Sequence, residues 1–238
     1  MTKKDLNIDL LICNTLDFDV AFKTLEYNAK FFNFNKKILI SNRDEKVNGY
    51  DIYNVGKFES IQQYSDFMPK LINYLDSDYL LLIQDDGHIV NPELWDENFL
   101  KFDYIGAPWP SSRKWLNRFK KYEYYNVVKN NMKKNRIGNG GFSLRSRKFL
   151  EFCSQFENCN GVPEDIFFCI LNYEEAKKHE INFAPFELAY KFSAEHSFRK
   201  LANKHPISNS KFNFHNHFGW HGKRFLNSDK LMNLKYEN

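Results

Sequence analysis

Residues 81–92, "LLIQDDGHIVNP", join an apolar run to a turn that carries two adjacent carboxylates. Such a run is typical of a strand buried on both faces of a parallel sheet. Ligands of open α/β sheets bind at the carboxyl ends of these strands, where Asp85 and Asp86 stand. Paired carboxylates repel each other unless a cation lies between them. Alternatively, the two side chains of a short acidic turn can simply accept hydrogen bonds from the backbone amides of that turn. The stretch therefore indicates a central strand ending at a ligand site, with a solvated turn as the alternative.

The flanking segments predict the rest of an α/β sheet, because apolar runs alternate with apolar residues at helical spacing. We expect Pro69 to kink or restart its helix, since proline lacks the amide hydrogen and clashes with the preceding turn. A helix that begins at Pro163 is the clearest, because two acids follow the proline in the first turn. The expected strands are 8–15, 36–41, 50–55, 78–84, 102–109 and a short one after the glycines of 138–141, and the expected helices begin after Thr15 or Asp17, near residue 59, near Ser146 and at Pro163.

Residues 109–136 are predicted to form a long irregular loop or a mobile helix. From Arg113 to Arg136 the sequence has nine basic residues and one acid, Glu123. The whole chain has 34 Lys and Arg against 30 Asp and Glu, a formal charge of +4, which is mild for a dedicated nucleic-acid binder. We therefore expect no nucleic-acid partner, and instead a local attraction to anionic ligands or peripheral contact with an anionic membrane through residues 113–136.

Length and composition indicate one folded domain. The chain has 238 residues, of which 17% are aromatic, so it can bury a large core. Its four cysteines show no paired spacing typical of metal sites or disulfides, and the amino terminus lacks the apolar length of a signal or a membrane span. We expect a cytoplasmic protein, with a peripheral position on the inner face of the membrane as an extension of that prediction.

Two later motifs carry polar chemistry. In "GNGG", residues 138–141, the glycines are typical of a turn with positive φ, or of close backbone approach to a sugar or diphosphate. Arg145 stands near enough in sequence to pair with phosphate oxygens. In "PED", the acids Glu164 and Asp165 stabilise a helix start through its dipole, and one of them can also serve as a general base.

Histidines gather near the carboxyl terminus, in "KFNFHNHFGWHG". On a strand, His215 and His217 would share one face, and His221 follows Gly219 at the edge of the next turn. Imidazole together with carboxylate suits manganese or zinc, whereas a single histidine is more often a hydrogen-bonded core residue. The sequence alone leaves both interpretations open.

Taken in chain order, these pieces resemble the GT-A-fold glycosyltransferases, and most closely a bacterial family of predicted sugar transferases classed as a domain of unknown function. The matching stretches span residues 80–222 and are "LLIQDDGHIVN", "FDYIGAPW", "GNGGFSLRSRKFL", "PEDIFF" and "FGWHG". The resemblance implies a GT-A, Rossmann-like fold with a mixed, mostly parallel sheet flanked by helices. It implies one catalytic domain, 1–238, with a nucleotide-sugar half at 1–110, the basic aromatic loop at 111–136 and an acceptor half at 137–238.

The resemblance also implies the chemistry. A nucleotide-sugar donor, with UDP-sugar as the first choice, would transfer its sugar to a glycan or lipid-linked acceptor in capsule or lipopolysaccharide synthesis. Mn²⁺ or Mg²⁺ would be held by an Asp-x-Asp-like turn, which here reads Gln84, Asp85, Asp86, so that an amide replaces the first acid. The implied metal ligands are Asp86 and His221, with His217 second, and Gln84, Asp85, Gly140, Gly141 and Arg145 are implied donor contacts.

By the same resemblance, Asp165 is the base of an inverting displacement and Glu164 contacts the acceptor. Two other classes remain open on the residues alone. A metal-dependent hydrolase could use Asp85, Asp86 and the histidines to activate water. A binding module could hold nucleic acid or anionic glycan through the basic loop. The oligomeric state is not indicated by any pattern.

Overall fold

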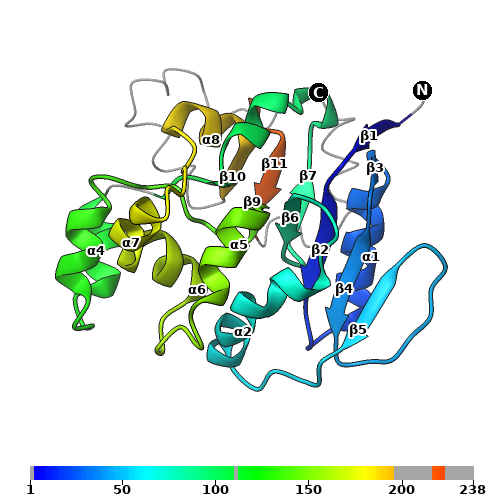
Figure 1. The fold of residues 1–238 in the computed structure, drawn as a ribbon, viewed down its shortest axis with the longest axis horizontal. Helices are drawn as coiled ribbons and strands as arrows, with labels where there is room; N and C mark the ends of the chain where they lie inside the picture. The colour runs from blue at the N-terminus through cyan, green and yellow to red at the C-terminus, as the bar shows by residue number, and fades with distance from the viewer. Residues whose placement is uncertain (1–2, 110–111, 196–215, 223–238) are drawn as a thin grey trace.

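The computed structural model of the protein describes residues 3–109, 112–195 and 216–222, and its centre is a six-stranded sheet (Figure 1). The strand order is β5-β4-β2-β6-β9-β8. The first four strands run parallel, and β9 is antiparallel to both of its neighbours. The strands are β2 (Asp9–Cys13), β4 (Lys37–Ser41), β5 (Asp51–Asn54), β6 (Tyr79–Ile83), β8 (Tyr104–Gly106) and β9 (Phe142–Ser146). The predicted mixed, mostly parallel sheet flanked by helices is confirmed.

The order of the strands fixes where a ligand can enter. From β2 the chain passes through α1 (Phe18–Ala29) to β4 and β5, and then returns through α2 (Ile61–Phe67) and η1 (Met68–Tyr74) to β6. Because parallel crossovers are right-handed, the connection from β2 to β4 and the connection from β5 to β6, which move along the sheet in opposite directions, cover opposite faces of it. The point where the order reverses lies between β2 and β6. In open α/β sheets, the carboxyl ends of the strands at such a point form the ligand crevice.

Side-chain caps and one proline start three of the helices where the sequence predicts. The Asp17 carboxylate accepts a hydrogen bond from the Val20 amide at 3.1 Å, so Asp17 rather than Thr15 caps α1. Ser146 caps α5 (Arg147–Ser154) in the same way. Pro69 stands in the first turn of η1, so the helix restarts there as a tighter helix, because the proline cannot continue the preceding hydrogen bonds.

A second, three-stranded sheet was not foreseen. It has the order β10-β11-β7, with β10 (Ser193–Glu195), β11 (Gly219–His221) and β7 (Gly87–Ile89). Strand β7 follows the acidic turn directly and pairs antiparallel with β11, so that Gly87 lies opposite His221. This pairing brings the end of the described chain back to the carboxyl end of β6.

The helix predicted to begin at Pro163 is divided into three parts. Pro163 caps α6 (Glu164–Ile166), a π-helix (Phe167–Leu171) follows, and α7 (Tyr173–Lys178) completes the run. The Asn172 amide donates to the Phe167 carbonyl at 3.0 Å, five residues back, which widens the helix. Such π-turns are frequent near functional sites.

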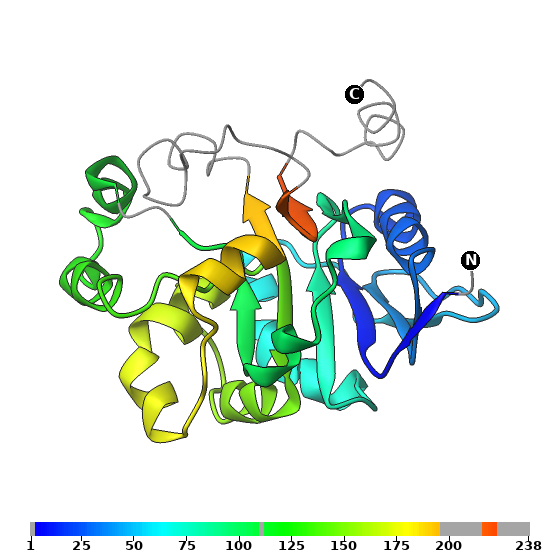
Figure 2. The same cartoon turned by 90° about the horizontal axis from the view of Figure 1, so that it is seen from above.

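Of the two conformations predicted for residues 109–136, the described part, 112–136, adopts the helical one and not the irregular loop. It contains α3 (Arg113–Leu116), η4 (Asn117–Phe119) and α4 (Tyr125–Asn131), which stand out at one edge of the molecule (Figure 2). Trp115 and Val128 are buried against the body of the protein. These few apolar contacts hold a segment whose charged residues, all but Glu123, are basic. We call residues 113–134 the basic hairpin.

The remaining elements are short. They are β1 (Lys4–Leu6), β3 (Phe32–Phe34), η2 (Pro92–Leu94), η3 (Glu97–Lys101) and α8 (Phe186–Phe192). All four cysteines are buried free thiols. Among the helices of the described ranges, none combines the length and the apolar character needed to cross a bilayer.

One buried carboxylate joins the amino-terminal strands. Asp9 on β2 has no exposed surface, and its oxygens accept hydrogen bonds from the amides of Asp76 and Ser77 at 2.8 and 2.9 Å. The Ser77 hydroxyl and the Asn35 amide group also donate to it, each at 2.9 Å. Four donors therefore satisfy one charge, and they connect β2 to the turns that precede β4 and β6.

We predict that Asp9→Asn lowers the free energy of unfolding by about 2–3 kcal/mol, because the new amide hydrogens face donors that now lack a charged acceptor. Urea unfolding followed by circular dichroism measures this loss. Asp78→Asn, at an exposed position on the turn before β6, is the matched control and should stay within about 0.5 kcal/mol of wild type. Equal effects of the two substitutions would contradict the role assigned to Asp9.

Candidate active site

The acidic turn, residues 84–86, is held by backbone hydrogen bonds from two distant segments. The Gln84 amide donates to the Gly141 carbonyl at 2.9 Å, and the Gly222 amide donates to the Asp86 carbonyl at 3.1 Å. The first bond extends the pairing of β6 with β9, and the second extends the pairing of β7 with β11. The turn is therefore fixed where both sheets end, and its side chains have a defined direction.

Asp86, His221 and Gln84 bring three potential ligand atoms together. His221 Nε2 lies 3.1 Å from Asp86 Oδ1 and 3.1 Å from Gln84 Oε1. The side chains of His221 and Asp86 are 14% and 13% exposed, so solvent and small ligands reach them. Carboxylate oxygen, amide oxygen and imidazole nitrogen are a donor set that suits Mn²⁺ or Mg²⁺. The residues present therefore fit the predicted cation.

Asp86 and His221 each shift the pKa of the other in the direction that favours its charged form. Burial alone would raise the pKa of Asp86, but the hydrogen bond and the charge of His221 outweigh it and lower that pKa. Burial alone would lower the pKa of His221, but the same contact with Asp86 raises it. Among the described residues, no group of three or more His, Cys, Asp and Glu side chains is placed to hold a metal ion. A cation here would thus rest on two such side chains and the Gln84 amide.

The glycine pair, Gly140 and Gly141, lies between this cluster and the start of α6. A Cβ on Gly141 would stand 2.0 Å from His221 Nε2, and a Cβ on Gly140 would stand 2.3 Å from Glu164 Oε1. Neither glycine has positive φ, so the turn conformation considered for "GNGG" is not the reason for them. The glycines are needed because two side chains of the protein itself occupy the space that a Cβ would fill.

Arg145 and Glu164 form a buried ion pair behind the glycine pair. Two guanidinium nitrogens of Arg145 lie 2.9 and 3.2 Å from the two Glu164 oxygens, and Arg145 Nε donates to the Ser143 hydroxyl at 3.0 Å. The paired side chains are 1% and 5% exposed. The structure thus places Arg145 and Glu164 against each other in the interior, and not on a surface open to a phosphate or an acceptor.

Asp165, the neighbour of Glu164, is only partly buried and stands against Gly140. Burial and, after it, the negative charge of Glu164 raise the pKa of Asp165 to about 7. Hydrogen bonds with the backbone of Ile166 and Gly140 oppose this shift without cancelling it. The Asp165 charge also contributes to the raised pKa of His221, so the two side chains lie within electrostatic reach of each other. The carboxyl is thereby suited to exchange protons near neutral pH.

A cavity of about 460 Å³ opens at the switch point between β2 and β6. Asn14 and Thr15 follow β2, Gln84 and Asp85 follow β6, and the first residues of α2 close the far side. Burial and the charge of Asp86 raise the pKa of Asp85. Two apolar side chains at this cavity, Leu16 and Ile61, are 72% and 69% exposed. The complete lining is Cys13, Asn14, Thr15, Leu16, Phe58, Glu59, Ser60, Ile61, Tyr64, Gln84 and Asp85.

The strand-end residues Asn14 and Thr15 were not among the predicted site residues. The signal that could have found them is the position of "CNT" at the carboxyl end of the first central strand, beside the point where strand order reverses. Tyr64 was missed as well, because only the fold brings its hydroxyl to Gln84 Nε2, at 3.3 Å.

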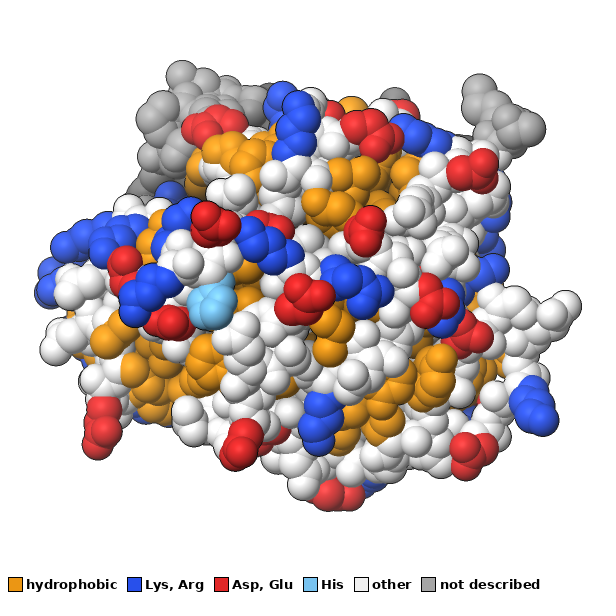
Figure 3. Space-filling model, viewed as in Figure 1, with side chains coloured by type: hydrophobic (Ala, Val, Ile, Leu, Met, Phe, Trp, Pro, Cys, Tyr) orange, Lys and Arg blue, Asp and Glu red, His pale blue; other side chains and the backbone are white. Residues whose placement is uncertain are grey.

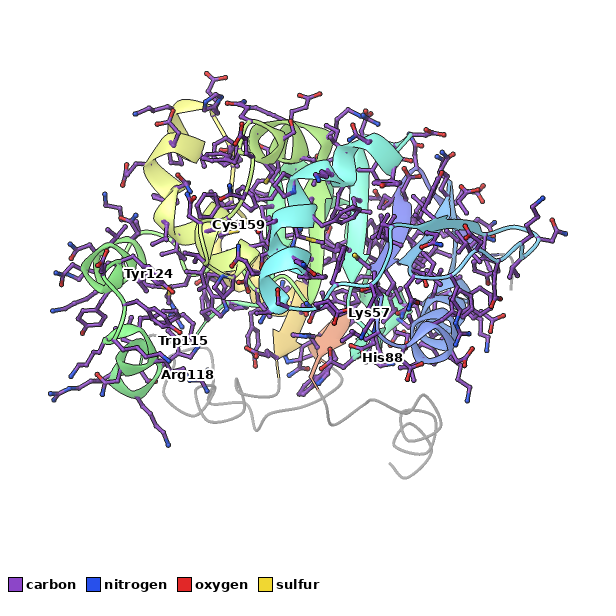
Figure 4. All side chains as sticks on the ribbon, turned by 90° about the horizontal axis from the view of Figure 1, so that it is seen from below. Lys57, His88, Trp115, Arg118, Tyr124 and Cys159 are labelled. Carbon is purple, nitrogen blue, oxygen red and sulfur yellow. The ribbon has the colours of Figure 1, made fainter. Side chains whose placement is uncertain are left out.

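Two histidines lie in the aromatic interior. His217 has no exposed surface, its ring contacts Tyr190, and its Nδ1 lies 2.5 Å from the Tyr190 carbonyl oxygen. His88, on β7, is 1% exposed and packs on Tyr27, and burial lowers its pKa to about 4 (Figure 4). The structure therefore brings His221, but not His217, to Asp86. His215 lies outside the described residues.

The fold is shared with known sugar transferases. The galactosyltransferase LgtC, solved with donor and acceptor sugar analogues, matches with a TM-score of 0.51 and 11% identity over 96% of this chain and 95% of that one. A glycosyltransferase involved in glycosylation of the major capsid of PBCV-1 matches at 0.52 and 12%, over 96% and 98% of the two chains. At these identities the likeness shows the fold, and the predicted GT-A fold is confirmed.

A weaker match is the bifunctional IspDF from Campylobacter jejuni, at a TM-score of 0.44 and 13% identity. It covers 68% of this chain, which spans only 46% of that protein. A search of curated proteins found no match.

One family model, described as "Protein of unknown function (DUF5672)", matches residues 50–214, well over half of the sequence. The chain therefore belongs to the DUF5672 family.

Proposed function

We propose that this protein is a glycosyltransferase that moves a sugar from a nucleotide-diphosphate donor, with UDP-sugar as the first choice, to a hydroxyl of a glycan or lipid-linked acceptor. The observation that carries the proposal is the convergence around the glycine pair: Asp86 and His221 lie on one side of it and Asp165 on the other. These residues come from three distant parts of the sequence. The cavity at Asp85 adds a place for the nucleoside next to them.

In this proposal each part of the site binds one part of the donor. The nucleoside enters the cavity between Asn14 and Asp85, where the exposed Leu16 and Ile61 offer apolar contact to a base. The diphosphate lies toward Asp86 and His221. A divalent cation, when bound there, supplies positive charge that stabilises the departing diphosphate. The sugar then faces Asp165 across the glycine pair.

The proposed reaction is an inverting displacement. The Asp165 carboxylate removes the proton from the acceptor hydroxyl as that oxygen forms a bond to the anomeric carbon. The bond from the anomeric carbon to the donor phosphate breaks, and the nucleoside diphosphate leaves with the electron pair. Arg145 and Glu164 act as positioning residues, because their buried pair fixes the start of α6 and the negative charge of Glu164 raises the pKa of Asp165. The capsule or lipopolysaccharide acceptor stays a prediction.

The first test concerns nucleotide and metal binding. UDP with Mn²⁺ at about 100 times its dissociation constant should stabilise the wild-type protein by about 2.7 kcal/mol in a thermal-shift assay, and by less without metal. Asp86→Ala and His221→Ala should remove the metal-dependent part, because each deletes a ligand. His179→Ala, at an exposed histidine on the surface, is the control and should respond like wild type. An unchanged metal response in both site variants would contradict the metal role.

The second test concerns the base. Asp165→Asn should lower the rate of sugar transfer by about 100-fold to 10,000-fold and leave the UDP-dependent thermal shift in place, because a general base acts on the acceptor and not on the nucleotide. Glu187→Gln is the matched control: Glu187 follows Pro185 in α8 at the position that Asp165 holds after Pro163 in α6, but it is exposed. Release of free sugar without an acceptor, at the rate of transfer, would instead favour the hydrolase.

The third test uses pH. Because Asp165 must be ionised to accept a proton, the transfer rate should rise with pH and level off above the raised pKa of about 7.

The raised pKa of Asp165 also makes the stability of the fold depend on pH. A carboxyl whose pKa is raised in the folded protein loses stability as pH rises from about 4 to 7, so Asp165→Asn should stabilise the fold by about 1–3 kcal/mol at pH 8 and hardly at pH 4. Chemical unfolding at both pH values measures this difference, and destabilisation at pH 8 would contradict the pKa assignment.

A further inference from the structure

The basic hairpin, residues 113–134, concentrates the positive charge of the protein. It has eight Lys and Arg residues and one acid, a formal charge of +7, whereas the whole chain carries +4. The rest of the chain therefore has a net charge of −3, the difference between these two values. A molecule divided in this way turns its hairpin toward a negatively charged surface and the remainder away from it.

The cations of the hairpin are exposed and mostly unpaired. Figure 3 shows Lys and Arg side chains gathered at the edge of the molecule over α4. Within the described residues, the one ion pair of the hairpin joins Lys134 to Glu174. The other exposed basic residues are Arg113, Lys114, Arg118, Lys120, Lys121, Lys129 and Lys133. Seven charges are thus left for a partner outside the chain.

Three contacts tie the hairpin to the rest of the protein, so its charges are held at a fixed place at the edge of the molecule. Trp115, labelled in Figure 4, is buried, and its ring centroid lies 5.8 Å from that of Trp109. The Asn131 side-chain amide donates to the Ile170 carbonyl at 2.8 Å. At the base of the hairpin, the Trp109 amide donates to the Arg136 carbonyl at 2.7 Å. Four residues after Arg136 the chain reaches the glycine pair, so the hairpin and the candidate active site share one continuous support.

Apolar and aromatic side chains accompany the charges. Tyr122 and Val127 are 41% and 43% exposed, which places an aromatic ring and a branched aliphatic side chain among the lysines. The Tyr122 ring is stacked on Tyr124 at 5.0 Å, and Lys121 Nζ lies 5.0 Å from its centroid. Tyr124 and Lys121 already occupy space over this ring, which limits stacking by a nucleic-acid base. The exposed tyrosine edge and hydroxyl suit a lipid headgroup layer.

We propose that the basic hairpin docks the protein on an anionic lipid membrane, with lysines and arginines facing the headgroups and Tyr122 and Val127 entering the interface. This docking does not depend on the proposed transfer reaction. If that reaction also holds, docking would bring the protein to the surface at which a lipid-linked acceptor presents its hydroxyl.

The test measures co-sedimentation of the full chain with vesicles. Wild-type protein should bind phosphatidylcholine vesicles that contain about one-third phosphatidylglycerol, should not bind pure phosphatidylcholine, and should be released by high salt. A variant with Lys114, Arg118, Lys120 and Lys121 all changed to Gln should bind the anionic vesicles at least about 100-fold more weakly. These side chains are exposed, so the variant should melt at the wild-type temperature.

A matched control loses the same charge elsewhere, through substitution of the exposed Lys23, Lys30, Lys46 and Lys70 by Gln. It should bind within about threefold of wild type, because the charge of the hairpin is intact. Three outcomes would each overturn the proposal. Both variants could lose vesicle binding equally, or the wild-type protein could show no preference for anionic vesicles. Single-stranded RNA at equal phosphate concentration could also displace the protein from the vesicles. Since the assay needs no sugar donor, its failure is separable from failure of the transferase proposal, which donor binding and transfer to a soluble acceptor test directly.

Discussion

The close approach of three chain segments at Gly140 and Gly141 is the constraint on which the site depends. His221, at the end of β11, and Glu164, at the start of α6, occupy the positions that side chains on these residues would need. The Gly141 carbonyl meanwhile accepts the amide of Gln84 from the acidic turn. A Cβ at 2.0 Å from a ring nitrogen cannot be accommodated, so a larger residue at Gly141 would displace the His221 ring from its present position. The candidate active site thus exists because the backbone here carries no side chain.

Two carboxylates near this point are given opposite properties by their neighbours. At Asp86 the hydrogen bond and charge of His221 outweigh burial, so the pKa falls and the carboxylate stays ionised. At Asp165 burial and the adjacent Glu164 raise the pKa, so the carboxyl can exchange a proton near neutral pH. Carboxyl groups whose pKa values are pushed apart are typical of a site that divides ligand binding from proton transfer. The same division supports the assignment of Asp86 to the donor and Asp165 to the acceptor.

The sequence predicted the central sheet well, because its strands are apolar runs and its helices begin at recognisable caps such as Asp17 and Ser146. It also predicted that Asp86 would stand at a strand end, since that follows from position alone. It did not predict β7, β10 and β11, because strands of three residues leave no readable period. The contact of His221 with Asp86 depends on the pairing of β7 with β11. It was therefore implied only by family resemblance, and the structure supplies its geometry.

Other differences have equally physical reasons. Arg145 looked like a phosphate ligand because a sequence cannot reveal that its guanidinium would be enclosed with Glu164. Such an ion pair is costly to bury, and removing one partner is also costly. Its presence therefore indicates that the start of α6 must be held in one position. The sequence left the basic hairpin open between a loop and a helix. Its buried apolar residues, such as Trp115 and Val128, stand among many charged ones, and their burial is decided by the surface they meet.

The central claim is that Asp86, His221 and Asp165 line one site for a nucleotide diphosphate and a cation. A crystal of the protein grown with UDP and Mn²⁺, with anomalous diffraction recorded at the manganese edge, tests it most directly. We expect one manganese peak about 2 Å from Asp86 and His221 Nε2, with the diphosphate beside it and the uracil in the cavity at Asn14 and Asp85. Manganese bound elsewhere, or UDP bound away from the glycine pair, would contradict it.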